Sequence, residues 1–289
     1  MKRKIIVVSN ASWFLQNFQM QFMKRLQKHN YEVVAVAPYD EWAPKFADIG
    51  VRYIELPMKR RGLNPFTDMN MTSRFYKIYK HECPDVIFHN TIKPVIFGSI
   101  AARYAHIGCV LNMIPGLGYV FVGDEFSKRG LRMLVKQMYK YALKISRRVF
   151  FQNPDDRDYF IEHEIIQKEK TDVTYGYGVD IDRFQYVDSN NTAGDYTFIL
   201  VARMLWDKGV GDFVEAARKI KNSFPRTRFQ LLGRIDNDNP SHIEKSAIDQ
   251  WVSNGIVEYL GEVPDVRSVV EKADVVVLPS YYREGVPNS

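Results

Sequence analysis

The 289-residue sequence has few cysteines and no long apolar run. Its two cysteines, Cys83 and Cys109, lack the Cys-x-x-Cys spacing, which argues against a zinc ribbon and against a disulfide-dense secreted protein. No apolar run approaches the ~18 residues of a membrane span. Only four apolar residues follow the basic start MKRK, whereas a signal peptide needs an apolar core of ~7–15 residues. We therefore expect a globular protein that is neither exported nor membrane-spanning.

Acidic residues are scarce in the first half of the chain. Residues 1–150 hold 24 lysines and arginines against 10 aspartates and glutamates, a balance of +14, whereas residues 151–289 hold 16 against 24, a balance of −8. This asymmetry predicts an anionic partner for the first half, such as a membrane face or a phosphorylated ligand. We expect no nucleic-acid partner, because the basic residues are not interleaved with aromatic residues that stack on bases. A solvated basic surface without a specific partner is the alternative.

Short β-branched runs alternate with amphipathic stretches in residues 1–175. The expected strands are Lys4–Val8, Glu32–Ala37, Val51–Leu56, Asp85–Phe88, Cys109–Met113, Val149–Phe151 and Asp172–Tyr175. The expected helices lie around Leu15–Gln27, Thr67–Tyr79, Ile96–Tyr104 and Ser127–Ser146. Fully apolar strands interleaved with helices are typical of a parallel sheet covered on both faces, so this half predicts a doubly wound α/β domain.

The alternation stops and then restarts. Tyr175–Asp195 is rich in Gly, Asp, Asn and Ser, which predicts a linker over residues 176–195. Beyond it we expect the strands Tyr196–Ala202, Phe229–Leu232, Val257–Leu260 and Val275–Leu278, and the helices Val210–Asn222, Ser241–Ser253 and Val266–Lys272. Residues 196–289 therefore predict a second, shorter doubly wound domain.

Open α/β sheets bind ligands at the carboxyl ends of their strands, so the loops after strands hold the candidate site residues. The segment VARMLWDKG, residues 201–209, leaves a strand and enters a helix. Its Arg203 and Lys208 lie beside a positive helix amino terminus, and all three favour a diphosphate. A surface Arg and Lys in an ordinary loop is the alternative.

The segment PSYYREGVPNS, residues 279–289, follows the last apolar run. Its Glu284 would accept hydrogen bonds from ligand hydroxyls, and the amides of Gly285 and Val286 would face a phosphate. A lone Glu in a loop is more often solvated. Glu284 therefore becomes a candidate site residue only in combination with the loop that holds Arg203 and Lys208.

Taken together, these loops resemble the donor half of the retaining glycosyltransferases of family four. The matching pattern is Arg-x-x-x-x-Lys-Gly after one strand and Glu-Gly-x-Pro after a strand about eighty residues later. The GLGYVF stretch, the LGEVPD turn and the GRIDNDNPS loop are also similar to members that build bacterial surface polysaccharides or lipid-linked oligosaccharides. The resemblance covers the whole chain and implies two Rossmann-like domains facing a cleft, the GT-B architecture.

The resemblance also implies roles for residues of the second domain. Arg203 and Lys208 would hold the donor diphosphate, Glu284 would contact the transferred sugar, and Leu260 and Val263 would lie by the nucleotide base. Catalysis would rest on Arg203, Lys208 and Glu284, mainly through positioning and stabilisation of the departing diphosphate. The implied reaction moves a hexose or N-acetylhexosamine from a nucleotide diphosphate, UDP by expectation, to a glycan acceptor. That acceptor would be carried on a polyprenyl diphosphate, as in capsule or O-antigen synthesis.

Loops of the first domain are expected on the acceptor side of the site. In SNAS, Ser9 and Asn10 stand where many relatives have Gly-Gly, and a hydroxyl and amide loop can still bind a sugar or a phosphate. The sequence holds no Gly-x-Gly-x-x-Gly fingerprint, which argues against a nicotinamide cofactor.

Two further acceptor-side loops follow the strands DVIF and CVLNM. The loop HNTIKP holds His89 and Lys93. We expect His89 to titrate near neutrality and to orient a sugar hydroxyl. A structural hydrogen-bonding role is the alternative for His89. In PGLGYVFVG, Gly116 and Gly118 permit close backbone approach, with a plain turn as the alternative.

A basic amphipathic segment at Lys128–Arg148 indicates where the protein acts. One face carries Lys128, Arg132, Lys136, Lys140 and Lys144, together with the apolar Met133 and Leu143, and the opposite side carries Leu131, Leu134, Val135, Met138, Ala142 and Ile145. With the second basic cluster at Lys59–Arg61, this predicts peripheral binding to an anionic surface on the cytoplasmic face of a membrane. A core-packed helix with a solvated outer face is the alternative.

Three Asp-x-Asp triplets raise the question of a metal ion. They lie at Asp156–Asp158, Asp180–Asp182 and Asp236–Asp238. Because Arg203 and Lys208 can neutralise the diphosphate, and because most Asp-rich loops are turns, we expect no metal and no other cofactor.

Two other functions stay open: a sugar-nucleotide epimerase on the same scaffold, and a non-catalytic protein that binds nucleotide sugars. The last strand is expected to be buried, yet no residues remain to form a covering helix, and a second Glu of the family motif would fall beyond Ser289. We therefore expect an incomplete second domain, in a truncated form that does not turn over. A short, complete protein is the alternative.

Overall fold

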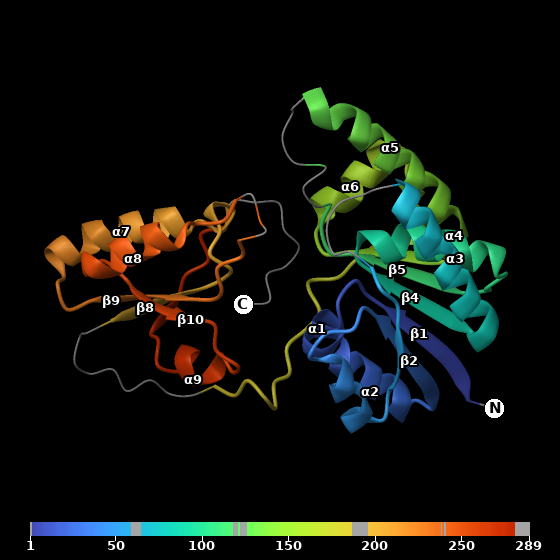
Figure 1. Cartoon of the computed structure of the whole chain (residues 1–289), viewed down its shortest axis with the longest axis horizontal. Helices are drawn as coiled ribbons and strands as arrows, with labels where there is room; N and C mark the ends of the chain where they lie inside the picture. Colours follow the sequence, from blue (N-terminus) through green and yellow to red (C-terminus); the bar gives the residue numbers. More distant parts are fainter. Residues whose placement is uncertain are drawn as a thin grey trace. The chain divides into compact units, whose positions relative to one another are not determined.

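The chain forms two compact units, each built on one parallel sheet. The computed structural model describes residues 2–58, 65–117, 121, 126–186, 196–237, 239 and 241–280. Unit 1 runs from Met1 to Val179, and unit 2 runs from Asp180 to Tyr282. Figure 1 shows helices packed on the sheet of each unit.

The sheet of unit 1 has seven strands in the order β3-β2-β1-β4-β5-β6-β7. The strands are β1 (Arg3–Val8), β2 (Tyr31–Ala37), β3 (Arg52–Glu55), β4 (Val86–Asn90), β5 (Val110–Ile114), β6 (Arg148–Phe151) and β7 (Thr171–Val173). Every pair of neighbours is parallel. The order reverses between β1 and β4, as in a dinucleotide-binding domain. The predicted doubly wound α/β fold is confirmed.

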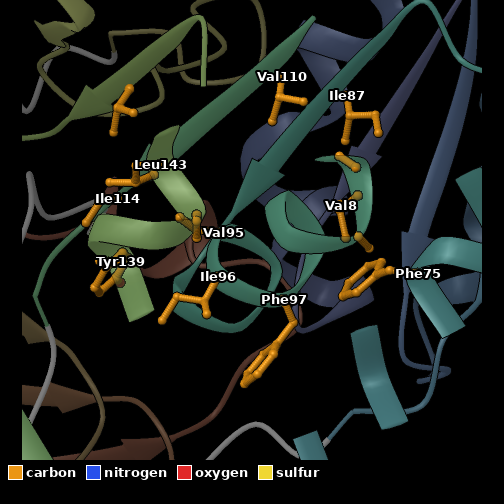
Figure 2. Packing of buried hydrophobic residues seen from close by; sticks show 14 of the residues in the cluster. Val8, Phe75, Ile87, Val95, Ile96, Phe97, Val110, Ile114, Tyr139 and Leu143 are labelled. Atoms are coloured by element: carbon orange, nitrogen blue, oxygen red, sulfur yellow. The ribbon is translucent and has the colours of Figure 1, made fainter. Parts of the chain in front are cut away.

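Helices cover both faces of this sheet because successive strand side chains point to opposite faces. Ile5 and Val7 of β1 pack in one apolar cluster, whereas Ile6 and Val8 pack in the other. The helical segments are α1 (Ser12–Phe14), η1 (Leu15–Gln19), α2 (Met20–Lys28), η2 (Ala43–Ile49), α3 (Pro65–Glu82), η3 (Pro94–Gly98), α4 (Ser99–Tyr104), α5 (Phe126–Ala142), η5 (Leu143–Ile145), α6 (Pro154–Glu162) and η6 (Lys168–Lys170). Figure 2 shows the larger cluster, in which Phe75 of α3 and Tyr139 of α5 are fully buried.

Unit 2 has a four-stranded sheet in the order β10-β9-β8-β11. Its strands are β8 (Thr197–Val201), β9 (Arg228–Leu232), β10 (Glu258–Gly261) and β11 (Val275–Val276), and all pairs are parallel. Its helical segments are η7 (Trp206–Lys208), α7 (Val210–Ser223), α8 (Lys245–Ser253) and α9 (Arg267–Val270). Leu200 and Leu231 of the sheet pack with Phe213 of α7 and Ile248 of α8. Figure 1 shows α7 and α8 on one side of this sheet and α9 on the other.

Two features differ from the expectations. The sequence did not predict α6, which begins with an Asn-Pro-Asp-Asp run of weak apolar periodicity; Asn153 caps it by accepting a 2.7 Å hydrogen bond from the N–H of Asp156. The expectation of a buried strand at residues 275–278 is wrong. Val275 and Val276 alone form β11, and their side chains are exposed, because β11 pairs with β8 on one side and the described helices pack mainly on its neighbours.

Candidate functional site

The loops after β8 and β11 lie against each other in unit 2. The strand order reverses between these two strands, which is where an open α/β sheet forms its ligand crevice. Gly209 has φ +70°, and a Cβ on it would stand 2.3 Å from the carbonyl oxygen of Pro279. The Oγ of Ser280 also donates to the carbonyl oxygen of Asp207 at 3.4 Å. The fold therefore brings together the end of the first predicted donor loop and the start of the second.

Arg203 forms an ion pair beside this crevice. Its Nη1 donates to Oδ2 of Asp236 at 2.7 Å; the Arg203 side chain is 44% exposed and that of Asp236 is 10% exposed. Asp236 follows β9 and begins the triplet that the sequence analysis considered as a metal site. Sequence reasoning missed the pair because its partners are 33 residues apart.

Backbone contacts fix the loop after β9 to the loop after β8. The N–H of Met204 donates to the carbonyl oxygen of Arg234 at 3.0 Å, and the carbonyl oxygen of Met204 accepts from the N–H of Ile243 at 3.0 Å. Gly233 has φ +142°, and a Cβ there would stand 1.9 Å from the carbonyl oxygen of Ala202, so that only glycine fits. The ion pair therefore lies between two loops whose backbones hold each other in place.

Lys208 lies in the same connection as Arg203. It ends η7, directly before Gly209 and α7, and its N–H donates to the carbonyl oxygen of Leu205 at 3.1 Å. The amino terminus of α7 carries unpaired N–H groups and a partial positive charge. The connection between β8 and α7 thus holds Arg203, Lys208 and the amino terminus of α7, and the charge of Arg203 is paired with Asp236.

The other predicted donor residues are less directly placed. Leu260 belongs to β10, not to the loop after it, and Val263 follows that strand. Leu260 lines a cavity of about 190 Å³ that is bordered by Thr197 and Arg228, the first residues of β8 and β9. The cavity therefore extends to the amino-terminal ends of β8 and β9, whereas Arg203 follows the carboxyl-terminal end of β8. Glu284, Gly285 and Val286, and Gly118 of unit 1, lie outside the described residues.

In unit 1 the strand order reverses between β1 and β4. Ser9 and Asn10 follow β1; Ser9 is fully buried and its N–H donates to the carbonyl oxygen of Val36 at 3.1 Å. Within the described residues its Oγ has no hydrogen-bond partner. Asn10 is half-buried. Of the two predicted residues in this loop, Asn10 is the one that is partly open to solvent.

Thr91, which follows β4, was not singled out from the sequence. Its φ of +72° is rare for a β-branched residue, and strain of this kind gathers at functional sites. Its Oγ1 is buried and, like Nε2 of Gln16 and of Gln152, has no partner among the described residues. The segments that follow β1 and β4 include π-helices, η1 and η3, which are also frequent at functional sites. The only sequence signal was the position of Thr91 directly after a strand.

His89 does not have the predicted properties. It lies inside β4, fully buried, with Nε2 2.8 Å from the Tyr79 hydroxyl and Nδ1 2.9 Å from Oδ1 of Asn112. Because Nδ2 of Asn112 donates to Ser146, Oδ1 accepts from Nδ1–H, and Nε2 accepts from Tyr79. Burial lowers the pKa of His89 to about 4, so the expectation of titration near neutrality is wrong. With both nitrogens bound inside the core, His89 has the structural role that the sequence left open.

The remaining acceptor-side predictions lie at the same edge of the unit 1 sheet. Lys93 is 3% exposed and directly precedes η3, and Gly116 is half-buried two residues beyond the end of β5. The fold thus places Lys93 and Gly116 after β4 and β5, at the edge where Ser9 follows β1.

Comparisons with known proteins identify the family of this chain. Residues 4–153 match the family model "Glycosyl transferase 4-like", and residues 195–289 match "Glycosyl transferases group 1". The chain belongs to the GT4-type glycosyltransferases. The predicted resemblance to this family is confirmed.

Three similar proteins illustrate the relationship. A Campylobacter jejuni N,N'-diacetylbacillosaminyl-diphospho-undecaprenol alpha-1,3-N-acetylgalactosaminyltransferase is 29% identical over 297 positions, covering 99% of this chain and 76% of that protein. An Escherichia coli UDP-Gal:alpha-D-GlcNAc-diphosphoundecaprenol alpha-1,3-galactosyltransferase is 22% identical, covering 94% and 71%. The crystal structure of a Rickettsia africae glycosyltransferase superposes with a TM-score of 0.74 at 16% identity, covering 98% and 74%. The last of these supports the predicted two-domain, Rossmann-like fold.

Helix α5 of this glycosyltransferase is less buried than its pattern predicts. Val135, Ala142 and Leu143 are buried, so the prediction that Leu143 lies on the exposed basic face is wrong. Met133, by contrast, is 68% exposed. Leu131 and Leu134, which the sequence places opposite to the basic face, are exposed too. The second basic cluster, Lys59–Arg61, lies outside the described residues. In the described part of the chain, α5 and the other helices are too short or too polar to cross a bilayer.

The Asp-x-Asp triplets of the glycosyltransferase serve other purposes where they are described. Asp156 lies in the capped first turn of α6, and Asp180 accepts hydrogen bonds from the N–H groups of Asp182 and Arg183. Asp236 pairs with Arg203. Among the described residues, no three His, Cys, Asp or Glu side chains gather as metal ligands would.

Proposed function

We propose that this glycosyltransferase moves a hexose or N-acetylhexosamine from a UDP-sugar to a glycan carried on a polyprenyl diphosphate. The observation that carries the proposal is the contact between the loops after β8 and β11, with Arg203 and Lys208 in the first of them. The names of the Campylobacter jejuni and Escherichia coli relatives both specify diphospho-undecaprenol acceptors, which supports the acceptor class. The name of the second one supports UDP as the donor nucleotide.

In this proposal the donor diphosphate binds between Arg203, Lys208 and the amino terminus of α7. Negative charge builds on the diphosphate as the bond to the sugar breaks, and fixed cations stabilise it. Glu284 would hold the sugar hydroxyls, Gly285 and Val286 would donate their amides, and Leu260 and Val263 would flank the base. The resemblance to the retaining glycosyltransferases of family four is the ground on which we assign this enzyme retention of the anomeric configuration. No side chain of the described residues stands out as a nucleophile, so this proposal includes no covalent sugar intermediate.

The acceptor would bind to unit 1. Ser9, Asn10, Lys93 and Gly116 follow the carboxyl ends of the unit 1 strands, where open α/β sheets take ligands. We include Gly118 in the acceptor site from the sequence alone. Hydroxyl, amide and ammonium groups suit a glycan and its diphosphate. His89 is left out of this set because both of its ring nitrogens are bound inside the core.

If the acceptor is carried on a polyprenyl diphosphate, the enzyme would act at the cytoplasmic face of a membrane. The exposed Leu131, Met133 and Leu134 of α5 lie among basic residues of a half with a charge balance of +14, which favours anionic lipid. We propose that this surface holds the enzyme on the bilayer in capsule- or O-antigen-type synthesis.

The test is transfer with a panel of UDP-, GDP- and dTDP-sugars and a synthetic undecaprenyl-diphosphate glycan, the products being identified by mass and by the anomeric NMR signal. We expect a UDP-hexose or UDP-N-acetylhexosamine to be consumed only when the acceptor is present, with retained configuration. A changed sugar nucleotide without acceptor would identify an epimerase. Thermal stabilisation by a nucleotide sugar without any reaction would identify a binding protein.

A further inference from the structure

The ion pair between Arg203 and Asp236 joins a fixed residue to an adjustable one. Asp236 is 10% exposed, and its loop is tied to the loop after β8 by the hydrogen bonds of Met204 and by the close approach of Gly233 to Ala202. Arg203 is 44% exposed and carries a long side chain with many rotamers. A carboxylate as buried as that of Asp236 needs an opposite charge beside it. The rotamers of Arg203 that place its guanidinium against Asp236 are therefore favoured over the others.

The contact leaves the guanidinium able to bind a second anion. It uses Nη1 alone of Arg203, whereas a guanidinium has five N–H groups in a rigid fork. One edge can thus rest on Asp236 while other N–H groups donate to phosphate oxygens. Ordering a long side chain before the ligand arrives reduces the entropy lost on binding.

We propose that Asp236 is a positioning residue, which holds the guanidinium of Arg203 in the orientation that binds the donor diphosphate. This inference rests on the proposed function, in which Arg203 contacts that diphosphate. In this proposal Asp236 acts only through Arg203 and does not bind the phosphates itself, because its carboxylate would repel their negative charge. Two other roles make different predictions: a competitor that occupies Arg203 until the donor displaces it, and a metal ligand.

The experiment measures the binding of UDP and of uridine to the full chain by calorimetry. The variants are Asp236→Asn, Asp236→Glu, Arg203→Ala and the double variant Arg203→Ala/Asp236→Asn. Asp249→Asn is the matched control, since Asp249 forms an exposed ion pair with Lys245 on α8 of the same unit. Thermal melting of each variant reports folding, and Asp236→Glu keeps the charge if Asp236→Asn does not fold.

We expect Asp236→Asn to weaken UDP binding about tenfold and to leave uridine binding unchanged, because only the diphosphate meets Arg203. Asp236→Glu should weaken UDP binding less. In the Arg203→Ala background, Asp236→Asn should have no further effect, since a positioning residue acts through the residue it positions. Equal loss of UDP and uridine binding would indicate a merely structural role.

Several results would overturn the inference. Tighter UDP binding by Asp236→Asn would make Asp236 a competitor, and additive effects in the double variant would separate it from Arg203. UDP binding that chelation abolishes and Mg²⁺ restores would make Asp236 a metal ligand. Wild-type protein that binds neither UDP nor another nucleoside diphosphate would defeat the proposed function as well, whereas UDP binding equal in wild type and Asp236→Asn defeats only this inference.

Discussion

Tyr79 and Asn112 decide which form of His89 the fold accepts. At the scale of single residues, unit 1 is held by buried polar groups with specific partners: His89 spans Tyr79 on α3 and Asn112 on β5, and Asn112 reaches Ser146. This network fixes the tautomer of the neutral imidazole, with Nδ1–H donating to Asn112 and Nε2 accepting from Tyr79. Burial lowers the pKa of His89 to about 4, although the hydrogen bond with Asn112 acts in the opposite direction.

Acid should weaken unit 1 through His89. Below its ordinary pKa of about 6.5 the unfolded chain binds a proton that the folded chain takes up only near pH 4, so the free energy of unfolding falls as the pH drops through this window. The expected loss is about 3 kcal/mol. Urea unfolding at pH 7 and pH 4.5 should show a flatter pH dependence for His89→Gln than for the wild type.

Other titrating groups also make the free energy of unfolding depend on pH, but the comparison of the wild type with His89→Gln cancels their effects. Arg52 and Lys4 lower the pKa of Glu82 to about 2, so its contribution is lost only below pH 4.5. The pKa of His242 is raised by its bonds to Asn239 and Glu244, so its contribution is present below pH 6.5 and lost as the pH rises. Both groups remain in His89→Gln. Parallel pH profiles of the wild type and the variant would contradict the role of His89.

Lys208→Ala and Arg203→Ala should each lower turnover. Lys208→Ala should leave the melting temperature unchanged, whereas Arg203→Ala should also lower it, because it leaves the carboxylate of Asp236 unpaired. Loss of one fixed cation at the departing diphosphate costs about 2–4 kcal/mol, or roughly 30- to 1000-fold in kcat. Lys219→Ala on α7 is the control, because Lys219 is exposed and forms only a surface pair with Glu215. Steady-state kinetics and melting curves give the two readouts. Near-normal turnover of Lys208→Ala would show that the diphosphate binds elsewhere.

At the scale of elements, local pattern predicted what local forces form. The strands at residues 3–8 and 31–37 were predicted to within a residue, because a strand buried on both faces appears in the sequence as a continuous apolar, β-branched run. The loop of Arg203 and Lys208 was predicted because its position after a strand is a property of the chain. The partner of Arg203 and the burial of His89 were not, since both depend on segments that meet only in the folded sheet. The π-helices η1 and η3 lacked any sequence signal.

Gly209→Ala should disrupt the junction between the loops after β8 and β11. The change combines a left-handed φ of +70° with a Cβ 2.3 Å from the oxygen of Pro279. Gly255→Ala is the matched control, since Gly255 has φ +68° and a Cβ added to it would meet no other atom of the described residues within 4 Å. We expect about 1 kcal/mol for Gly255→Ala from φ alone and clearly more for Gly209→Ala. Chemical denaturation measures both, and equal losses would mean that the contact with Pro279 relaxes freely.

At the scale of the whole molecule, the charge asymmetry and α5 predict how the enzyme meets a bilayer. The basic half and the exposed Leu131, Met133 and Leu134 should give binding to anionic vesicles that weakens as salt rises, at about 1 kcal/mol per basic residue near the lipid. Sedimentation with neutral and anionic vesicles at low and high salt is the measurement.

Single variants locate that membrane surface. Met133→Glu should reduce vesicle binding, whereas Val252→Glu, at an exposed apolar position on α8 of unit 2, should not. Equal binding of the wild type to neutral and anionic vesicles would contradict the electrostatic account. Equal effects of the two variants would place the surface outside α5.

The close approach of Gly233 to Ala202 has a consequence for mutational scanning. In a selection of all single substitutions for enzyme activity, position 233 should tolerate almost nothing, although no atom of Gly233 is needed for chemistry. The proposed sugar and phosphate contacts would show the same intolerance. Tolerance to substitution alone would then not distinguish the structural residues of unit 2 from its catalytic residues. Scoring the same library a second time for cellular abundance would distinguish them. Substitution of Gly233 should lower the amount of protein, whereas substitution of Lys208 should lower only its activity.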